Sequence, residues 1–240
     1  MTNVAENERV KSKRPKNTES QLIFGGTFDP FHLGHLNLCK HVAGDLDVNT
    51  ITLLPANIPP HKAAAKVSSQ HRLAMLQALA QQEPLFRVDG RELNRDKPSY
   101  TVDTLKEIKL ETPALSLSLL IGMDSLLSFT QWHQWQEIIA RVNLIVCTRP
   151  NYTLDIKQLH TELQKRLTDK ASLNLADVGQ IYLAPSANVD LSSTDIRYQL
   201  SQVNTYDSSS VTTSSQVPSQ AFNQLPKVIA EYIKQRQLYC

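Results

Sequence analysis

The sequence predicts an α/β fold, an open parallel sheet with helices on both of its faces. Short apolar runs alternate along the chain with longer segments that have helical periodicity. The apolar runs are hydrophobic at nearly every residue, which is typical of strands that are covered on both faces. Strands and helices that alternate in this way favour a parallel sheet whose strands are joined by helices.

The apolar runs predict the strands, with boundaries good to about two to four residues. They are Leu22–Gly25, Thr50–Leu54, Leu85–Val88, Leu115–Ile121, Asn143–Cys147 and Gln180–Leu183. Helices are expected between them: one begins near Gly34, another follows Ser69 as its cap, and a third follows Thr101. A last helical segment, Leu225–Leu238, is expected to pack on the edge of the sheet.

The length and composition predict one soluble domain. With 240 residues and 41% hydrophobic content, the chain is long enough to bury one substantial core, which we expect within residues 21–240. The formal net charge is only +2, from 25 basic and 23 acidic residues, so no nucleic-acid partner is expected. The longest apolar runs are far shorter than the roughly 20 residues that cross a bilayer, so no membrane partner is expected either.

Two segments have the composition of flexible chain. Residues 1–20 mix acids with Lys and Arg and lack the apolar stretch of a secretory signal, so we expect a disordered N-terminal extension and a cytoplasmic protein. Residues 203–220 are rich in Ser and Thr and predict a flexible surface insertion between two helices. The three cysteines have no spacing typical of a zinc site or a redox pair, so they are expected to be reduced.

The segment Phe24–His35, which reads FGGTFDPFHLGH, predicts a loop that binds phosphate. It follows the first expected strand, and ligands of open parallel sheets bind at the carboxyl ends of the strands. Gly25 and Gly26 remove side chains that would keep a phosphate from backbone N–H groups. His32 and His35 stand at the start of a helix, on one face and near its positive end.

Other interpretations of this loop fit less well. A single histidine is more often a structural one, and two glycines can form an ordinary tight turn, but the complete loop after a buried strand favours a site. Gly25, Gly26 and Gly34 do not have the spacing of a GxGxxG dinucleotide fingerprint. A Walker A loop is excluded because the segment has no Gly-Lys-Ser/Thr.

A second segment, Leu191–Arg197, reads LSSTDIR and supports the same chemistry. The hydroxyls of Ser193 and Thr194 stand where a helix would begin, and Arg197 adds a permanent positive charge on its first turn. Taken alone, Ser193 and Thr194 are more often simple helix caps. Their occurrence together with the histidine loop favours a phosphate site.

With these two motifs, the sequence resembles the HxGH nucleotidyltransferase superfamily. Further segments resemble the nicotinate-nucleotide adenylyltransferases within it, which join nicotinate mononucleotide to the AMP part of ATP: residues 55–62, 98–101 and 121–126, and the region of Trp132. The likeness runs from about Leu22 to Arg197 and resumes from Leu225 to Tyr239. It implies a Rossmann-like fold of the nucleotidyltransferase type.

The resemblance implies ATP and nicotinate mononucleotide as partners, and it leaves a homo-oligomer open. Mg²⁺ is expected with ATP, because it neutralises a polyphosphate, and no dedicated metal site is expected in the protein. Catalysis would rest on His32, His35 and Arg197, which stabilise charge, with His35 at the α-phosphate and His32 at the neighbouring phosphates.

The resemblance also assigns residues to each substrate. Asp124 would lie near the adenosine ribose, with helix capping as the alternative, and Lys62 is the weakest candidate. The residues expected at ATP are Gly25, Gly26, Thr27, Phe28, His32, His35, Lys62, Gly122, Asp124, Ser193, Thr194 and Arg197.

For the acceptor, the resemblance places Trp132 against the pyridine ring. Tyr100, Thr101 and His133 would surround the carboxylate and ribose, with backbone N–H groups binding the carboxylate. We assign Trp135 to the core, because burial is the ordinary fate of a tryptophan.

Two other functions stay open. Another adenylyltransferase of the superfamily would use nicotinamide mononucleotide or phosphopantetheine, and the motifs around ATP cannot separate these acceptors. A non-catalytic nucleotide sensor is less favoured, because such a protein would be expected to lose a catalytic group, and all the expected ones are present.

Overall fold

The computed structural model describes residues 20–57, 65–96, 98–148, 154–185, 191–202 and 217–239. The expected N-terminal extension falls outside these ranges except for Ser20, and the expected insertion falls outside them up to residue 216. The last residues of the expected insertion, from residue 217 on, belong to a helix, α8 (Val217–Phe222). Lys62 and Cys240 also lie outside the described residues, so nothing is concluded about either side chain.

The described chain forms the predicted open sheet, and every pairing between its strands is parallel. The strand order is β3-β2-β1-β4-β5-β7-β6. Each expected strand agrees with an observed one to within two residues at either end, and the short β6 was not expected because two residues leave no apolar run. The strands are β1 (Ser20–Gly26), β2 (Ile51–Pro55), β3 (Phe86–Val88), β4 (Ser116–Gly122), β5 (Val142–Cys147), β6 (Leu167–Thr168) and β7 (Ile181–Ala184).

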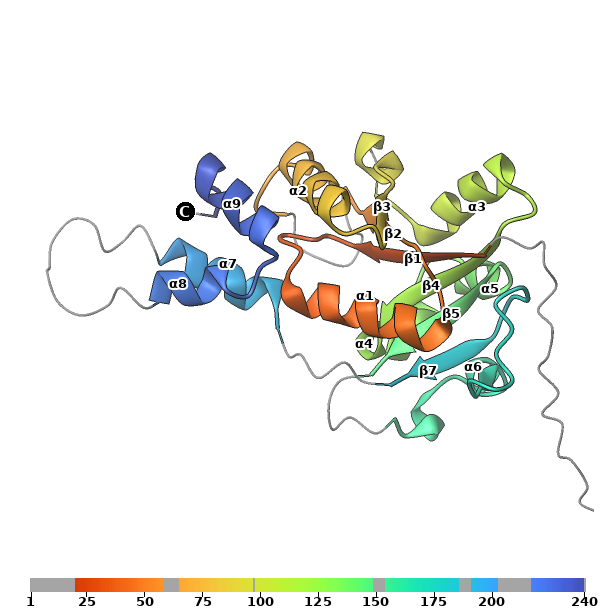
Figure 1. Ribbon diagram of the computed structural model, residues 1–240. Coiled ribbons are helices and arrows are strands. Elements are labelled where there is room, and N and C mark those ends of the chain that lie inside the picture. The colour runs from red at the N-terminus through yellow and green to blue at the C-terminus, as the bar shows by residue number, and fades with distance from the viewer. Residues whose placement is uncertain are drawn as a thin grey trace, which may run out of the picture.

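Helices cover both faces of the sheet, as the apolar strands predicted, and Figure 1 shows α1 and α3 on opposite sides of β1. One buried cluster joins the sheet to α1, α2, α7 and α9, and the other joins it to α3, α4, α5 and α6. The α-helices not yet bounded are α1 (Leu33–Leu46), α2 (Ser69–Gln82), α3 (Thr101–Glu111), α4 (Met123–Leu127), α5 (Trp135–Ile139), α6 (Thr161–Gln164), α7 (Ser193–Ser201) and α9 (Lys227–Arg236).

In β1, β2, β4, β5 and β7, the residues enter both clusters, which lie on opposite faces of the sheet. Leu22 and Phe24 of β1 face the α1 side, whereas Ile23 between them faces the α3 side. Trp135 is only 8% exposed and packs on the α3 side, so its assignment to the core is confirmed. The two-sided burial explains why the strand sequences lack polar alternation.

Two details of the helices differ from the expectation. The cap of α2 is Ser68, one residue before the expected Ser69, because Ser68 has an extended backbone and its side chain accepts a hydrogen bond from the His71 N–H. Helix α9 lies against α2 (Figure 1), so it reaches the core through that helix rather than on the edge of the sheet.

The order of the strands creates a crevice beside β1. The chain builds β2 and β3 on one side of β1 and then crosses back to place β4 on its other side. In open parallel sheets, ligands bind at the carboxyl ends of the strands where the order reverses in this way. The segment after Gly26, at the end of β1, therefore lies at the expected ligand site.

Candidate active site

Two adjoining cavities lie at this crevice, with volumes of about 670 Å³ and about 380 Å³. They share part of their lining, including Gly25–Thr27 at the end of β1, Ser125 of α4 and Trp132. The larger cavity is lined by residues of both segments that were predicted to bind phosphate. The smaller cavity lies beside the start of α3.

His32 and His35 fix the start of α1 by capping each other. The His35 N–H donates to Nδ1 of His32, and the His32 N–H donates to Nδ1 of His35, each at 3.3 Å. The two rings stack with centroids 3.7 Å apart and planes 22° from parallel. The prediction that both side chains share one face is confirmed, and both line the larger cavity.

Burial keeps His32 neutral. The residue is 4% exposed, and desolvation lowers the pKa of its imidazole from 6.5 to about 4. Because Nδ1 accepts a hydrogen bond, the proton of the neutral ring is on Nε2. His32 therefore offers an N–H donor rather than a positive charge.

The glycine between the histidines makes room for this arrangement. A Cβ at Gly34 would lie 2.9 Å from the His32 ring and 3.2 Å from Cβ of Leu191, which belongs to the second motif. The glycine of the HLGH segment is therefore required by the packing of the histidine ring, and its absent side chain lets the two motifs approach each other.

The glycines at the end of β1 have different roles. A Cβ at Gly25 would meet no protein atom within 4 Å, which agrees with the predicted approach of a ligand. A Cβ at Gly26 would lie 2.9 Å from the Phe28 ring, so this glycine accommodates a side chain. Phe28 has a left-handed backbone (φ 49°) and packs its ring 5.6 Å from those of Phe31 and His35.

Helix α7 brings the second motif to the loop. Its cap is Ser192, whose side chain accepts from the N–H groups of Thr194 and Asp195, so neither Ser193 nor Thr194 is the capping residue. The Ser193 hydroxyl donates to the Pro30 carbonyl at 3.0 Å. Nη1 of Arg197 donates to the Asp29 carbonyl at 2.7 Å. These bonds join the two motifs.

The end of β4 supplies two more of the expected residues. Gly122, which has no side chain, occupies the cap position of α4, and Asp124 lies in the first turn of that helix. Both line the larger cavity. The carboxylate of Asp124 stabilises the positive end of α4 from within the helix, which leaves its predicted position near a ribose compatible with the geometry.

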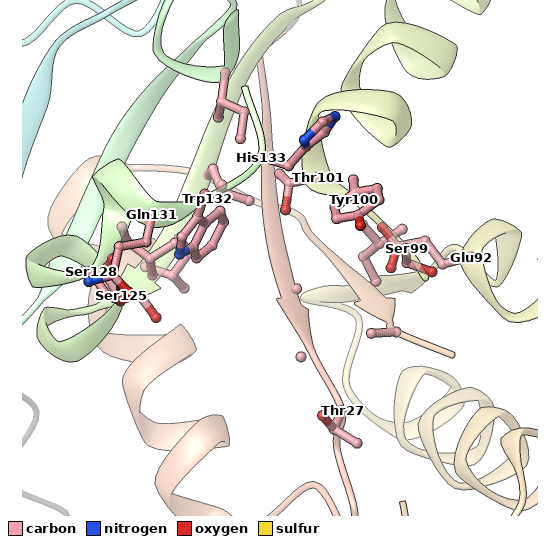
Figure 2. Close-up of a pocket in the computed structure, with 18 residues that line it drawn as sticks. Thr27, Glu92, Ser99, Tyr100, Thr101, Ser125, Ser128, Gln131, Trp132 and His133 are labelled. Carbon is pink, nitrogen blue, oxygen red and sulfur yellow. Dashed lines mark hydrogen bonds between the residues drawn. The ribbon is translucent and has the colours of Figure 1, made fainter. Parts of the chain in front are cut away.

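The smaller cavity contains the residues expected at the acceptor. Tyr100, Thr101, Trp132 and His133 all line it. Figure 2 shows Trp132 across the cavity from Tyr100, with Ser99 on the Tyr100 side. The rings of Tyr100 and His133 contact each other, with centroids 4.5 Å apart.

The same cavity meets the amino end of α3. Tyr100 is the cap residue of this helix, and its side chain makes no capping hydrogen bond within the described residues. Thr101 is the first helical residue and lines the cavity. Free N–H groups at the start of a helix attract an anion, so this end of the cavity suits a carboxylate.

The protein is similar to known nucleotidyltransferases. The family model described as cytidylyltransferase-like matches residues 23–199. A protein of Yersinia enterocolitica named "Probable nicotinate-nucleotide adenylyltransferase" is 38% identical over 221 residues, which cover 90% of this chain and 94% of that one. A Serratia proteamaculans protein of the same name is 42% identical over 184 residues, 75% of this chain and 84% of that one. The chain belongs to the nicotinate-nucleotide adenylyltransferase family.

The fold is also found in a solved structure. The nicotinic acid mononucleotide adenylyltransferase of Plasmodium falciparum, complexed with NaAD, superposes with a TM-score of 0.66 at 16% identity. The match covers 92% of this chain and 97% of that chain. The predicted family and the predicted Rossmann-like α/β fold are both confirmed.

The structure brings the expected ATP residues of this adenylyltransferase together. Those that line the larger cavity are Gly25, Gly26, Thr27, Phe28, His32, His35, Gly122, Asp124, Ser193, Thr194 and Arg197. Lys62 lies outside the described residues. The roles of the individual side chains stay predictions, since lining a cavity does not by itself identify a contact with substrate.

Several polar residues around the loop have no counterpart among the residues predicted from the sequence. Arg72 of α2 is 1% exposed, and its Nη1 donates to the carbonyls of Thr27 at 2.8 Å and Ala56 at 2.7 Å. Asp29 is 4% exposed and accepts hydrogen bonds from the Lys66 N–H and the Tyr239 hydroxyl. Of these residues, Asp29 alone lies within the histidine loop. The sequence around Arg72 contains no motif that would indicate a contact with the loop.

The smaller cavity also has an unexpected acid. Glu92 is 5% exposed, accepts a 2.6 Å hydrogen bond from the Thr104 hydroxyl, and lines the cavity beside Ser99. Burial raises the pKa of its carboxyl above the ordinary value. Glu92 lies in a short polar stretch after β3. Such a stretch is typical of a surface turn, so the sequence does not predict a buried acid there.

Substitution of Gly34 tests the packing of the histidine pair. In Gly34→Ala the new Cβ would displace the His32 ring, and we expect kcat to fall about 10- to 100-fold because the catalytic geometry shifts. Gly44→Ala in the same helix is the control, because a Cβ there meets nothing within 4 Å. Activity of Gly34→Ala within twofold of the wild type would contradict the packing argument.

The pH dependence of stability tests the neutral state of His32. Between pH 6.5 and 4 the unfolded chain binds a proton on His32 that the folded chain does not bind, so stability falls as the pH falls. We expect the free energy of unfolding to drop by about 3 kcal/mol more in the wild type than in His32→Asn between pH 7 and 4. Asn keeps a capping side chain but does not titrate. Denaturant titrations that give the same drop for both proteins would show that His32 is not buried as a neutral ring.

Proposed function

We propose that this member of the family transfers the AMP part of ATP to nicotinate mononucleotide, forming nicotinate adenine dinucleotide and pyrophosphate. The observation that carries the proposal is the shared wall of the two cavities at Gly25–Thr27. One cavity has the donors that suit a polyphosphate, and the other has aromatic rings and an uncapped helix end. A phosphate at the shared wall can be reached from either side.

The reaction needs no covalent intermediate on the protein. An oxygen of the acceptor phosphate attacks the α-phosphorus, the bond to the bridging oxygen breaks, and pyrophosphate leaves with the electron pair. Such transfers depend on positioning and on stabilisation of charge. His35 would donate to the α-phosphate, and His32 would donate from Nε2 to the neighbouring phosphates and the leaving group.

The remaining charge of the phosphates would be met by α7. Arg197 and Thr194 already contact each other, with Nη2 of Arg197 donating to the Thr194 hydroxyl at 3.1 Å. We assign them to the β- and γ-phosphates. The Ser193 hydroxyl donates a hydrogen bond to the Pro30 carbonyl and so positions the loop. Any contact of Ser193 with the phosphates would therefore come from its backbone N–H.

We propose Mg-ATP as the nucleotide substrate. Within the described residues, no group of three or more His, Cys, Asp or Glu could hold a metal ion. Both carboxylate oxygens of Asp29 in the larger cavity accept hydrogen bonds from the protein. A cation that enters with ATP, held by phosphates and water, agrees with this set of donors.

The acceptor would bind with its pyridine ring on Trp132 and its carboxylate at the start of α3. The uncapped N–H groups at Tyr100 and Thr101 favour a carboxylate over a neutral amide, which supports the nicotinate form. His133 would complete the ribose side. The raised pKa of Glu92, caused by burial, makes that neighbour less repulsive to an anion than an exposed glutamate would be.

The cellular setting stays a prediction. None of the helices in the described part of the chain is long and apolar enough to cross a membrane. We place the reaction in the cytoplasm, which agrees with the free, buried thiols of Cys39 and Cys147. A homo-oligomer remains open.

Release of pyrophosphate with different acceptors tests the proposed reaction. With Mg²⁺ and ATP, we expect turnover with nicotinate mononucleotide and much slower turnover with nicotinamide mononucleotide and with phosphopantetheine. Preference for another acceptor would keep the ATP site and overturn the assignment of the smaller cavity. If ATP binds but no acceptor supports release, the nucleotide sensor is the better function.

Replacement of His35 tests its catalytic role. We expect His35→Asn to lose about two to three decades of kcat, because one preorganised donor to the transition state is removed. His41→Asn, at an exposed position of the same helix, is the control and should retain activity. Turnover of His35→Asn within a few-fold of the wild type would show that His35 does not stabilise the reacting phosphate.

A further inference from the structure

We propose that Tyr239, near the end of the chain, is a positioning residue of the active site. Its hydroxyl donates to Oδ1 of Asp29 at 2.8 Å, across 210 positions of sequence. By holding this carboxylate, Tyr239 would keep Arg197 directed at the polyphosphate. The effect of Tyr239 on catalysis rests on the proposed function, whereas its contact with Asp29 is independent of that function.

Asp29 is held on both sides. Its Oδ1 accepts from Tyr239, and its Oδ2 accepts from the backbone N–H of Lys66 at 2.7 Å. The residue is 4% exposed, so water cannot replace a lost partner without rearrangement. Two donors in fixed positions set the plane of the carboxylate.

The orientation of that carboxylate decides what Arg197 can do. Nη1 of Arg197 is 3.8 Å from Oδ2 of Asp29, too far for a hydrogen bond, and donates instead to the Asp29 carbonyl at 2.7 Å. Without the Tyr239 hydroxyl, Oδ1 loses its donor, and the carboxylate can turn about the bond that Oδ2 keeps with the Lys66 N–H. A hydrogen-bonded ion pair, closer than the present 3.8 Å contact, would then compete with the phosphates for Arg197.

Tyr239 acts on a limited part of the loop. The preceding turn has its own support, because Arg72 binds the carbonyl of Thr27 and the carbonyl of Ala56. The loop after it is supported by Ser193, which donates to the Pro30 carbonyl. Loss of the Tyr239 hydroxyl therefore releases Oδ1 of Asp29, while the Lys66 contact of Oδ2 and these backbone contacts remain.

Helix α9 and the residues that follow it place the Tyr239 side chain beside Asp29. Helix α9 packs on α2 through buried apolar side chains that both helices contribute to one core cluster. The helix ends at Gln237 in a left-handed conformation, and Tyr239 is itself left-handed with φ 66°. A tyrosine adopts this backbone rarely and at some cost, so the contacts of its side chain hold it there.

The test compares two tyrosines whose hydroxyls have different partners. Tyr239→Phe and Tyr232→Phe each remove one hydroxyl with one hydrogen-bond partner, but only Tyr239 contacts the active-site loop. We expect Tyr239→Phe to lower kcat/KM for ATP about 10- to 100-fold with KM for nicotinate mononucleotide within twofold. Tyr232→Phe should leave both constants within twofold. Equal behaviour of the two variants, or a loss that falls on the acceptor, would overturn the proposal.

A double-mutant cycle tests whether Tyr239 acts through Asp29. If it does, Tyr239→Phe should cost little in a chain that already carries Asp29→Asn, because the neutral side chain cannot pair with Arg197. Losses that multiply would show that the two residues act independently and would overturn the proposal.

Binding of Mg-ATP, measured by calorimetry, separates failure of this inference from failure of the proposed function. If the wild type binds ATP but transfers AMP to no acceptor, the proposed function fails, and weaker binding by Tyr239→Phe than by Tyr232→Phe would still support the positioning role. Equal binding by the two variants in that case would overturn it.

Discussion

The reciprocal capping of α1 by His32 and His35 is the constraint on which the site depends. The two imidazoles accept the N–H groups of His32 and His35, and the Leu33 N–H between them donates to the Gln224 carbonyl. Forming the start of the helix therefore also places the two rings, which line the larger cavity. The stacked rings leave no space for a side chain at Gly34, and that glycine is also where Leu191 of the second motif approaches. The spacing of the HLGH segment therefore follows from geometry at the start of one helix.

The same contacts decide the electrostatics. A histidine used as a cap and buried beside another ring is a poor place for a positive charge, and burial lowers the pKa of His32 accordingly. The permanent charge comes from α7, where Arg197 is held by the loop and by Thr194. The site thus combines a neutral donor at His32 with the cation of Arg197. Hydrogen bonds from such a donor to an anion strengthen when water is excluded, because the local dielectric falls.

The sequence was most informative where the pattern is local. Strands such as β2 and β5 were predictable because every residue is buried and all but Thr52 and Asn143 are apolar, and the histidine loop was recognisable because its residues are consecutive. The short β6 was not predictable, since two residues carry no periodicity. Contacts such as Arg72 with Thr27, or Tyr239 with Asp29, join segments far apart in sequence, and a buried arginine on a helix looks the same in a single sequence as an exposed one. The cap at Ser68 differs by one residue from Ser69 because adjacent serines give equal local signals.

These long-range contacts explain why the last helix matters to a loop near the start of the chain. The carbonyls and the carboxylate of the segment after β1 accept hydrogen bonds from α2, from α7 and from the tail behind α9. No short stretch of chain can hold this segment by itself, because a loop with buried polar groups needs partners from elsewhere. The geometry of the loop therefore depends in part on the docking of α9 on α2, because Tyr239 reaches Asp29 from the segment that follows α9. The positioning role proposed for Tyr239 thus extends the determinants of catalysis to the last helix, which is remote from the reacting atoms.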